Sequence, residues 1–207
     1  MAIKNIIFDY GGVIFDIDHG KTSKAFEELG LKDGPEFFGH GGQVLLFDEF
    51  ERGAISAAEF RARIRAHFDK PVTDKEIDDA WSRMLIGIPE GNLELLMKIK
   101  AKYRTFLLSN NNALHYIWIM KYLEREFQLE EGMRPFFEKD YYSHQLGMRK
   151  PRKEIFQFVL DLHRLDPAET LFIDDSSQHI ETAEKMGIQV YLKDPKKPLA
   201  KVLDPYL

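Results

Sequence analysis

The chain has 207 residues, of which 44% are hydrophobic and 30% are charged, a balance typical of a folded globular protein. With 29 Lys and Arg against 34 Asp and Glu, the formal net charge is -5, which argues against a general nucleic-acid-binding protein. The absence of cysteine excludes a disulfide framework, a thiolate nucleophile and a zinc–thiolate site. We find neither a signal-peptide pattern nor an apolar run of membrane-spanning length, so we expect a cytoplasmic protein without a membrane partner.

The first predicted element is a short buried strand at residues 3–8, which is rich in β-branched and aromatic side chains. The strand ends at Asp9, and Gly11 and Gly12 follow closely, so a tight turn is expected there. An isolated aspartate after a strand is often only structural. A functional role for Asp9 therefore needs support from other parts of the chain.

Residues 16–88 have a different pattern, with several helix starts and no clear strand. Two capping boxes, each a Ser or Thr followed three residues later by Glu, begin at Ser56 and Thr73. We therefore predict that residues 16–88 form a small helical domain, inserted into a core made of residues 1–15 and 89–207.

Strands and helices alternate after residue 88. The predicted strands are 104–108, 171–173 and 188–192, and the predicted helices are 89–102, 112–127, 152–163 and 178–186. This alternation favours an α/β fold with a Rossmann-like, doubly wound parallel sheet. The tail from residue 194 holds three prolines, and we expect a peripheral turn or short helix there.

Polar side chains follow three of the predicted strands. Asp9 follows the first, Ser109 and Asn110 follow the second, and Asp174 and Asp175 follow the third. Ligands of open parallel sheets bind outside the carboxyl ends of the strands. We therefore expect these side chains to meet in one crevice, although they are far apart in the sequence.

A fourth candidate is Lys150, which lies just before a predicted helix; its alternative interpretation is a solvated surface lysine. The four groups together suit phosphate-monoester hydrolysis. A carboxylate can be the nucleophile, and a hydroxyl and an ammonium group can bind the phosphoryl oxygens. Adjacent carboxylates such as Asp174 and Asp175 are costly without a cation, and magnesium prefers oxygen ligands of this kind.

In this order, the four clusters resemble the motif set of the haloacid dehalogenase superfamily. The resemblance covers nearly the whole chain, and the helical segment 16–88 stands where that family places its cap domain. It implies a HAD-like core and a magnesium-dependent phosphatase that acts on a small phosphorylated metabolite through an aspartyl phosphate on Asp9.

The resemblance also implies roles for individual residues in metal binding. Asp9 matches the nucleophile and the first ligand of Mg²⁺, and Gly11 would offer its backbone carbonyl. Asp175, helped by Asp174, matches the later metal-binding carboxylates.

The same resemblance implies a phosphate-binding set. Ser109 and Lys150 match the catalytic hydroxyl and amine that bind the phosphoryl group. Tyr10, Gly11 and Asn110 complete the set, and the backbone amides of Tyr10 and Asn110 would donate to the phosphoryl oxygens.

Two positions depart from the family pattern. Most phosphatases of the superfamily carry a general acid and base at the position of Gly11, so the proton would come from Asp16, Asp18 or a cap residue, or the leaving oxygen would be weakly basic. His179 stands where the family usually has Asp or Asn. The other histidines considered are His115, His144 and His163, and we interpret all four, His179 included, as packing or surface residues.

A narrower resemblance concerns the branch that contains α-D-glucose-1-phosphate phosphatases, whose members also lack the second aspartate. It rests on the stretches 9–18, 51–56 and 146–151, and it makes a sugar 1-phosphate a reasonable substrate. Two other functions remain open: a metal-independent 2-haloacid dehalogenase and a non-catalytic binding protein of the same fold. The oligomeric state is left open.

Overall fold

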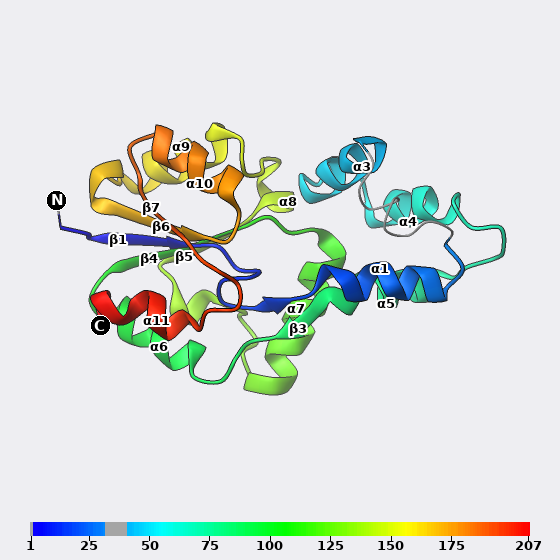
Figure 1. The fold of residues 1–207 in the computed structure, drawn as a ribbon, viewed down its shortest axis with the longest axis horizontal. Helices are drawn as coiled ribbons and strands as arrows, with labels where there is room; N and C mark the ends of the chain where they lie inside the picture. The colour runs from blue at the N-terminus through cyan, green and yellow to red at the C-terminus, as the bar shows by residue number, and fades with distance from the viewer. Residues whose placement is uncertain (1, 32–40) are drawn as a thin grey trace.

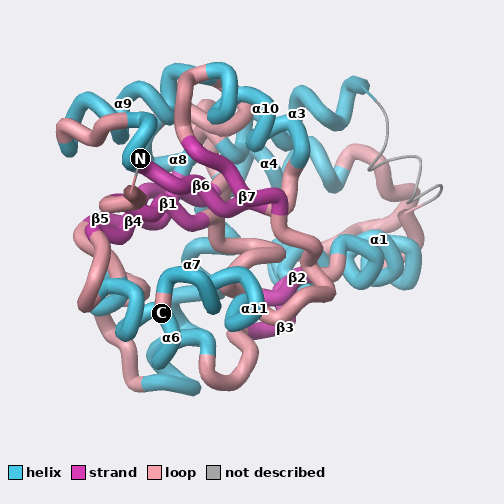
Figure 2. The backbone as a smooth tube through the Cα atoms, turned by 60° about the vertical axis from the view of Figure 1, so that its left-hand side comes forward, coloured by secondary structure: helices cyan, strands magenta, loops and turns pink. Residues whose placement is uncertain are grey.

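The computed structural model describes the backbone of residues 2–31 and 41–207, and the side chains of 2–31 and 45–207. A five-stranded sheet with the order β5-β4-β1-β6-β7 forms its centre (Figures 1 and 2). Every neighbouring pair in this sheet is parallel, which confirms the predicted α/β class. The strands are β1 (Asn5–Phe8), β4 (Arg104–Ser109), β5 (Lys139–Tyr142), β6 (Thr170–Asp174) and β7 (Gln189–Leu192).

Helices cover both faces of the sheet (Figure 1). Successive side chains of a strand point to opposite faces, so β1 places Ile6 and Phe8 in one hydrophobic cluster and Ile7 in another. The cluster of Phe8 also takes side chains from α6, α7 and α11, and the cluster of Ile7 takes them from α9 and α10. The bounds are α6 (Asn92–Lys100), α7 (Ala113–Phe127), α8 (Ser143–Leu146), α9 (Lys153–His163), α10 (Ser177–Lys185) and α11 (Leu199–Leu203).

A group of helices lies to one side of the sheet and has a hydrophobic cluster of its own (Figure 1). Phe26, Phe60 and Ile77 are fully buried in this cluster, and Leu114 of α7 joins it from the core. The helices are α1 (His19–Glu28), α3 (Gly41–Glu51), α4 (Ala57–Arg65) and α5 (Asp74–Trp81). They fall inside the predicted helical segment 16–88, of which 32–40 lies outside the described residues; its exact boundaries stay a prediction.

The two predicted capping boxes differ. At the start of α5, the Thr73 hydroxyl accepts from the Glu76 N–H and the Glu76 carboxylate accepts from the Thr73 N–H, so the box is complete. At the start of α4, Ser56 accepts from the Glu59 N–H, but the Glu59 carboxylate pairs with Arg63. Ser56 is thus a simple N-cap.

The structure differs from the expectations in three places. The segment 16–88 does contain strands, because β2 (Asp16–Ile17) pairs with β3 (Leu85–Gly87) in a short antiparallel ladder where the chain leaves and re-enters the core. The edge strand β5 was not predicted, since it begins with two charged residues and is only four residues long. The tail forms the expected short helix, α11, but it is not peripheral, because α11 buries Leu199, Val202 and Leu203 in the core.

Within the described residues, no helix has both the length and the apolar character needed to cross a membrane.

Candidate active site

The strand ends place the predicted polar residues together. Asp9 directly follows the central strand β1 and donates its backbone N–H to Ile173 of β6 at 2.9 Å. Ser109 is the last residue of β4 and Asp174 the last of β6, the two neighbours of β1. The expected convergence at the carboxyl edge of the sheet is confirmed.

Lys150 is the centre of the site. Its side chain is 0% exposed, and its Nζ lies 2.7 Å from Asp9 Oδ1 and 2.6 Å from Asp174 Oδ2. The interpretation as a solvated surface lysine is therefore wrong. A buried ammonium is tolerated here because two carboxylates surround it.

Asn110 positions Lys150 in a way that the sequence did not reveal. Its Oδ1 accepts from the Lys150 backbone N–H, and its Nδ2 donates to the Lys150 carbonyl, both at 2.9 Å. This reciprocal pair ties the end of β4 to the loop before α9. From the sequence, Asn110 was interpreted only as a phosphate-binding residue. No local pattern connects residue 110 with residue 150, so this contact could not be predicted.

The charges of the site depend strongly on burial. Burial raises the pKa of Asp9 to about 7, with Asp174 and Asp175 adding to this and Lys150 opposing it. Burial also raises the pKa of Asp174, but the interactions with Lys150 and His179 outweigh burial and lower this pKa to about 2. Burial and Asp174 raise the pKa of Asp175. One lysine does not neutralise three carboxylates.

The carboxylates of Asp9, Asp174 and Asp175 fit a metal ion. Each offers an oxygen, and the three oxygens lie within 4.8 Å of one another. A set made only of carboxylate oxygens suits a hard divalent cation such as Mg²⁺. Gly12 allows this approach, since a Cβ there would lie 2.1 Å from Asp175 Oδ2.

The turn after β1 leaves donors available. Within the described part of the chain, the backbone N–H groups of Tyr10, Gly11 and Asn110 find no hydrogen-bond acceptor. The Ser109 hydroxyl has one long contact, 3.4 Å to the Asn110 carbonyl. These groups lie on residues that line the same pocket, so an anion bound beside Asp9 would find several donors.

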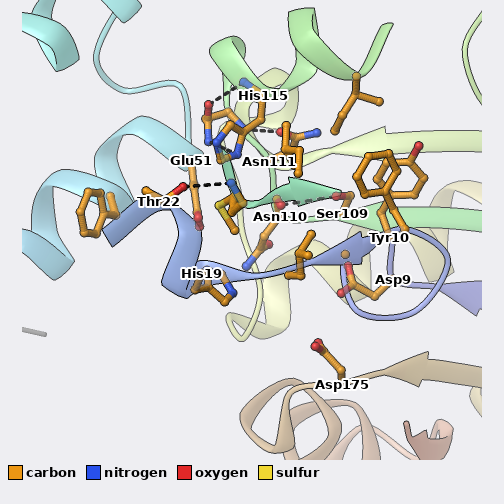
Figure 3. A pocket seen from close by; sticks show the side chains of 18 of the residues that line it. Asp9, Tyr10, His19, Thr22, Glu51, Ser109, Asn110, Asn111, His115 and Asp175 are labelled. Atoms are coloured by element: carbon orange, nitrogen blue, oxygen red, sulfur yellow. Dashed lines mark hydrogen bonds between the residues drawn. The ribbon is translucent and has the colours of Figure 1, made fainter. Parts of the chain in front are cut away.

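A pocket of about 720 Å³ extends from these residues to α1, α3 and α5, which belong to the helical segment 16–88. Figure 3 shows Asp9, Ser109 and Asp175 around one end and Thr22, Glu51 and His115 around the other. Neither Asp16 nor Asp18 is among the lining residues, and Asp18 instead caps α1. The expected replacement of the missing acid by one of these two aspartates is not supported. Ile17 fills the space beside Gly11, because a Cβ added to Gly11 would lie 3.2 Å from Ile17 Cδ1.

Two histidines belong to the site. His179 Nδ1 lies 2.9 Å from Asp174 Oδ1, so its interpretation as a packing or surface residue was wrong. Burial lowers the pKa of His179. His115 lines the pocket but is buried as predicted, and it is stacked on Trp81 with the ring centroids 4.9 Å apart.

The chain also matches known proteins. The model of the haloacid dehalogenase-like hydrolase family matches residues 3–187, which is most of the chain. This protein therefore belongs to the haloacid dehalogenase-like hydrolases, as the resemblance of its motifs indicated.

Three relatives are informative. A D-ribitol-5-phosphate phosphatase of Bacteroides thetaiotaomicron is 35% identical over 190 residues, which are 91% of this chain and 91% of that protein. The structure of a HAD family enzyme from the same organism, in complex with magnesium and inorganic phosphate, has a TM-score of 0.87 and 37% identity, and covers 97% of this chain and 99% of its own. A HAD-like family hydrolase from Porphyromonas gingivalis has a TM-score of 0.88 and 30% identity, and covers 99% and 98%.

Proposed function

We propose that this protein is a magnesium-dependent phosphatase that hydrolyses the phosphate monoester of a small sugar or sugar alcohol. The observation that carries the proposal is the buried group of Asp9, Asp174 and Lys150, with Asp175 beside it. The similarity to a D-ribitol-5-phosphate phosphatase, and to an enzyme solved with magnesium and phosphate, supports it.

In the first step, an oxygen of Asp9 attacks the phosphorus. The bond between phosphorus and the leaving oxygen breaks, and an aspartyl phosphate forms while the alkoxide takes a proton from water or from a group of the pocket. Lys150 holds Asp9 Oδ1 at 2.7 Å, which leaves Oδ2 for the attack. Lys150 and the Ser109 hydroxyl stabilise the charge on the transferring oxygens.

In the second step, water attacks the phosphorus of the aspartyl phosphate. The bond between phosphorus and the Asp9 oxygen breaks, which restores the carboxylate and releases inorganic phosphate. The proton that water loses goes to solvent or to a group of the pocket.

Asp9, Asp174 and Asp175 would hold Mg²⁺, with the Gly11 carbonyl as a further ligand. The bound ion supplies positive charge that lets a carboxylate approach a phosphate dianion. His179 holds the Asp174 carboxylate in place, and Asn110 does the same for Lys150.

Residues 16–88 act in this proposal as a cap over the core made of 1–15 and 89–207. The pocket is lined by both parts, so the cap contributes to the choice of the leaving group. A ribitol 5-phosphate carries its phosphate on a primary alcohol, whereas the sequence favoured a sugar 1-phosphate. The sugar 1-phosphate as substrate stays a prediction.

The test is hydrolysis of p-nitrophenyl phosphate by the wild type and by Asp9→Asn, each with magnesium and with EDTA. We expect turnover by the wild type that EDTA abolishes and added magnesium restores. Asp9→Asn should lose at least about 10³-fold in kcat, because the amide is a far weaker nucleophile, while circular dichroism shows a folded protein.

Two results would contradict the proposal. Dehalogenation of a 2-haloacid that resists EDTA, without phosphatase activity, would favour the dehalogenase. Failure of the wild type on a broad set of phosphate esters would favour a non-catalytic binding protein.

A further inference from the structure

Buried polar atoms without a partner are concentrated at the pocket. Among the described residues, four buried side-chain atoms make no hydrogen bond, and three of them belong to pocket-lining residues. These three are Tyr10 Oη, Glu51 Oε2 and Arg149 Nε. These three atoms are themselves closed off from the pocket, but Glu51 and Arg149 also keep 25% and 22% of their side chains exposed there, so polar groups of both line the pocket.

Glu51 and Arg149 come from opposite sides of the pocket and meet. Glu51 is the last residue of α3 in the cap, and Arg149 directly precedes the catalytic Lys150 in the core. Arg149 Nη2 lies 3.0 Å from Glu51 Oε2, but the contact lacks the alignment of a hydrogen bond. Both residues line the same pocket as Asp9.

The Arg149 guanidinium and the backbone of Glu51 are held in place by contacts away from the pocket. Arg149 Nη1 lies 3.3 Å from Asp48 Oδ1. The Ser143 hydroxyl lies 2.6 Å from the Glu51 carbonyl, and a Cβ on Gly53 would lie 2.3 Å from the His144 carbonyl, so the end of α3 packs closely on the core. Little freedom is lost when such fixed groups bind a ligand.

The two charged groups select one kind of ligand group. The Arg149 guanidinium can only donate, and the Glu51 carboxylate can only accept. A hydroxyl both accepts and donates, so it can bind to both groups. A second phosphate or a carboxylate would be repelled by Glu51, and an ammonium group could not accept from Arg149.

We infer that Glu51 and Arg149 bind hydroxyl groups on the carbon chain of the leaving alcohol and thereby select polyhydroxylated phosphate esters. This inference rests on the proposed phosphatase function and assigns its specificity to one residue of the cap and one of the core. Lys150 binds the phosphate group of the substrate, and the adjacent Arg149 binds hydroxyl groups on the carbon chain that carries this phosphate.

The test compares two esters that differ only in their hydroxyl groups. A pentitol 5-phosphate and n-pentyl phosphate have the same number of carbons and the same primary leaving oxygen, so the ratio of their kcat/KM values measures hydroxyl recognition alone. We expect the wild type to prefer the pentitol ester by about tenfold or more. Glu51→Gln and Arg149→Lys should each lower the ratio by about tenfold, because one charged hydrogen bond is lost.

The control is Glu49→Gln. Glu49 lies on the same helix but pairs with Arg63 inside the cap and does not line the pocket, so the ratio should stay at the wild-type value. A wild-type ratio near one, or an unchanged ratio in both pocket variants, would overturn the inference while phosphatase activity persists. Absence of wild-type activity on both esters and on p-nitrophenyl phosphate would instead refute the proposed function.

Discussion

Gly12 shows how one residue without a side chain shapes the proposed metal site. Its φ is +72°, and a Cβ would lie 2.1 Å from Asp175 Oδ2 and 2.7 Å from its Cγ. Asp175 therefore lies against the turn after β1 only because residue 12 is glycine. Gly91 also has a positive φ, +81°, but the nearest atom to its Cβ would be Glu94 Oε2 at 3.7 Å. A side chain at either glycine would strain the backbone, but only a side chain at Gly12 would also clash with Asp175. Substitutions at the two positions therefore separate backbone strain from the steric clash.

We expect Gly12→Ala to lower kcat for p-nitrophenyl phosphate by at least about tenfold, because the methyl group displaces one of the three carboxylates that would hold the metal ion. Gly91→Ala should cost a similar strain of about 1 kcal/mol in the free energy of unfolding but keep wild-type turnover. The measurements are steady-state kinetics and urea denaturation. Equal kinetics in the two variants would show that Asp175 tolerates the displacement.

At the scale of elements, a polar network joins the end of α5 to the start of α7. Trp81 Nε1 donates to Asn112 Oδ1 at 3.3 Å, and Asn112 Nδ2 lies 3.1 Å from His115 Nδ1. His115 Nε2 lies 3.0 Å from the Trp81 carbonyl, which can only accept. The His115 ring therefore carries its proton on Nε2, and Nδ1 accepts from the Asn112 amide. A second proton on His115 Nδ1 would point at the Asn112 Nδ2–H donor, so the protonated ring is disfavoured.

This network predicts a dependence of stability on pH. Burial lowers the pKa of His115 from 6.5 to about 4, so the unfolded chain binds a proton that the folded protein does not. The stability contributed by neutral His115 is complete above pH 6.5 and is lost as the pH falls towards 4, by up to about 1.4 kcal/mol per pH unit.

The measurement is the free energy of unfolding of the wild type and of His115→Gln between pH 7.5 and pH 5. Glutamine does not titrate, and the carboxylates are common to both proteins. The stability advantage of the wild type should therefore shrink as the pH falls. A constant advantage, or one that grows in acid, would show that His115 is not held neutral.

At the scale of the whole molecule, Asp48 of the cap connects to the core through ion pairs. Its carboxylate lies 2.8 Å from Arg52 within the cap, 3.3 Å from Arg149 and 3.4 Å from Arg152 of the core. Despite partial burial, these arginines lower the pKa of Asp48 and keep it charged. The pocket lies between the two parts, so these contacts bear on how closely the cap covers it.

We expect Asp48→Asn to raise KM for p-nitrophenyl phosphate about threefold to tenfold with little change in kcat, since a network worth roughly 1 kcal/mol is weakened. In the wild type, high salt should raise KM in the same direction. The matched control is Asp78→Asn, because Asp78 pairs with Arg61 inside the cap at 2.7 Å. That variant should lose thermal stability and keep the wild-type KM; an equal rise in both would mean that no cap–core contact is involved.

Much of the fold could be predicted because its signals are local. The strands that end at Phe8, Ser109 and Asp174 are runs of β-branched and aromatic residues followed by polar ones, and such runs indicate buried strands without further context. Strand β5 lacked this signal because an edge strand tolerates the charged residues Lys139 and Asp140.

The sequence by itself determined which residues could do chemistry, since Asp9, Ser109, Lys150 and Asp175 each stand in a recognisable local pattern. Only the tertiary structure decided how they are held. Lys150 between two carboxylates, the Asn110 amide on the Lys150 backbone, and Glu51 against Arg149 all join segments that are far apart in the chain. Such contacts depend on the distances between packed elements, and no local pattern of residues encodes those distances.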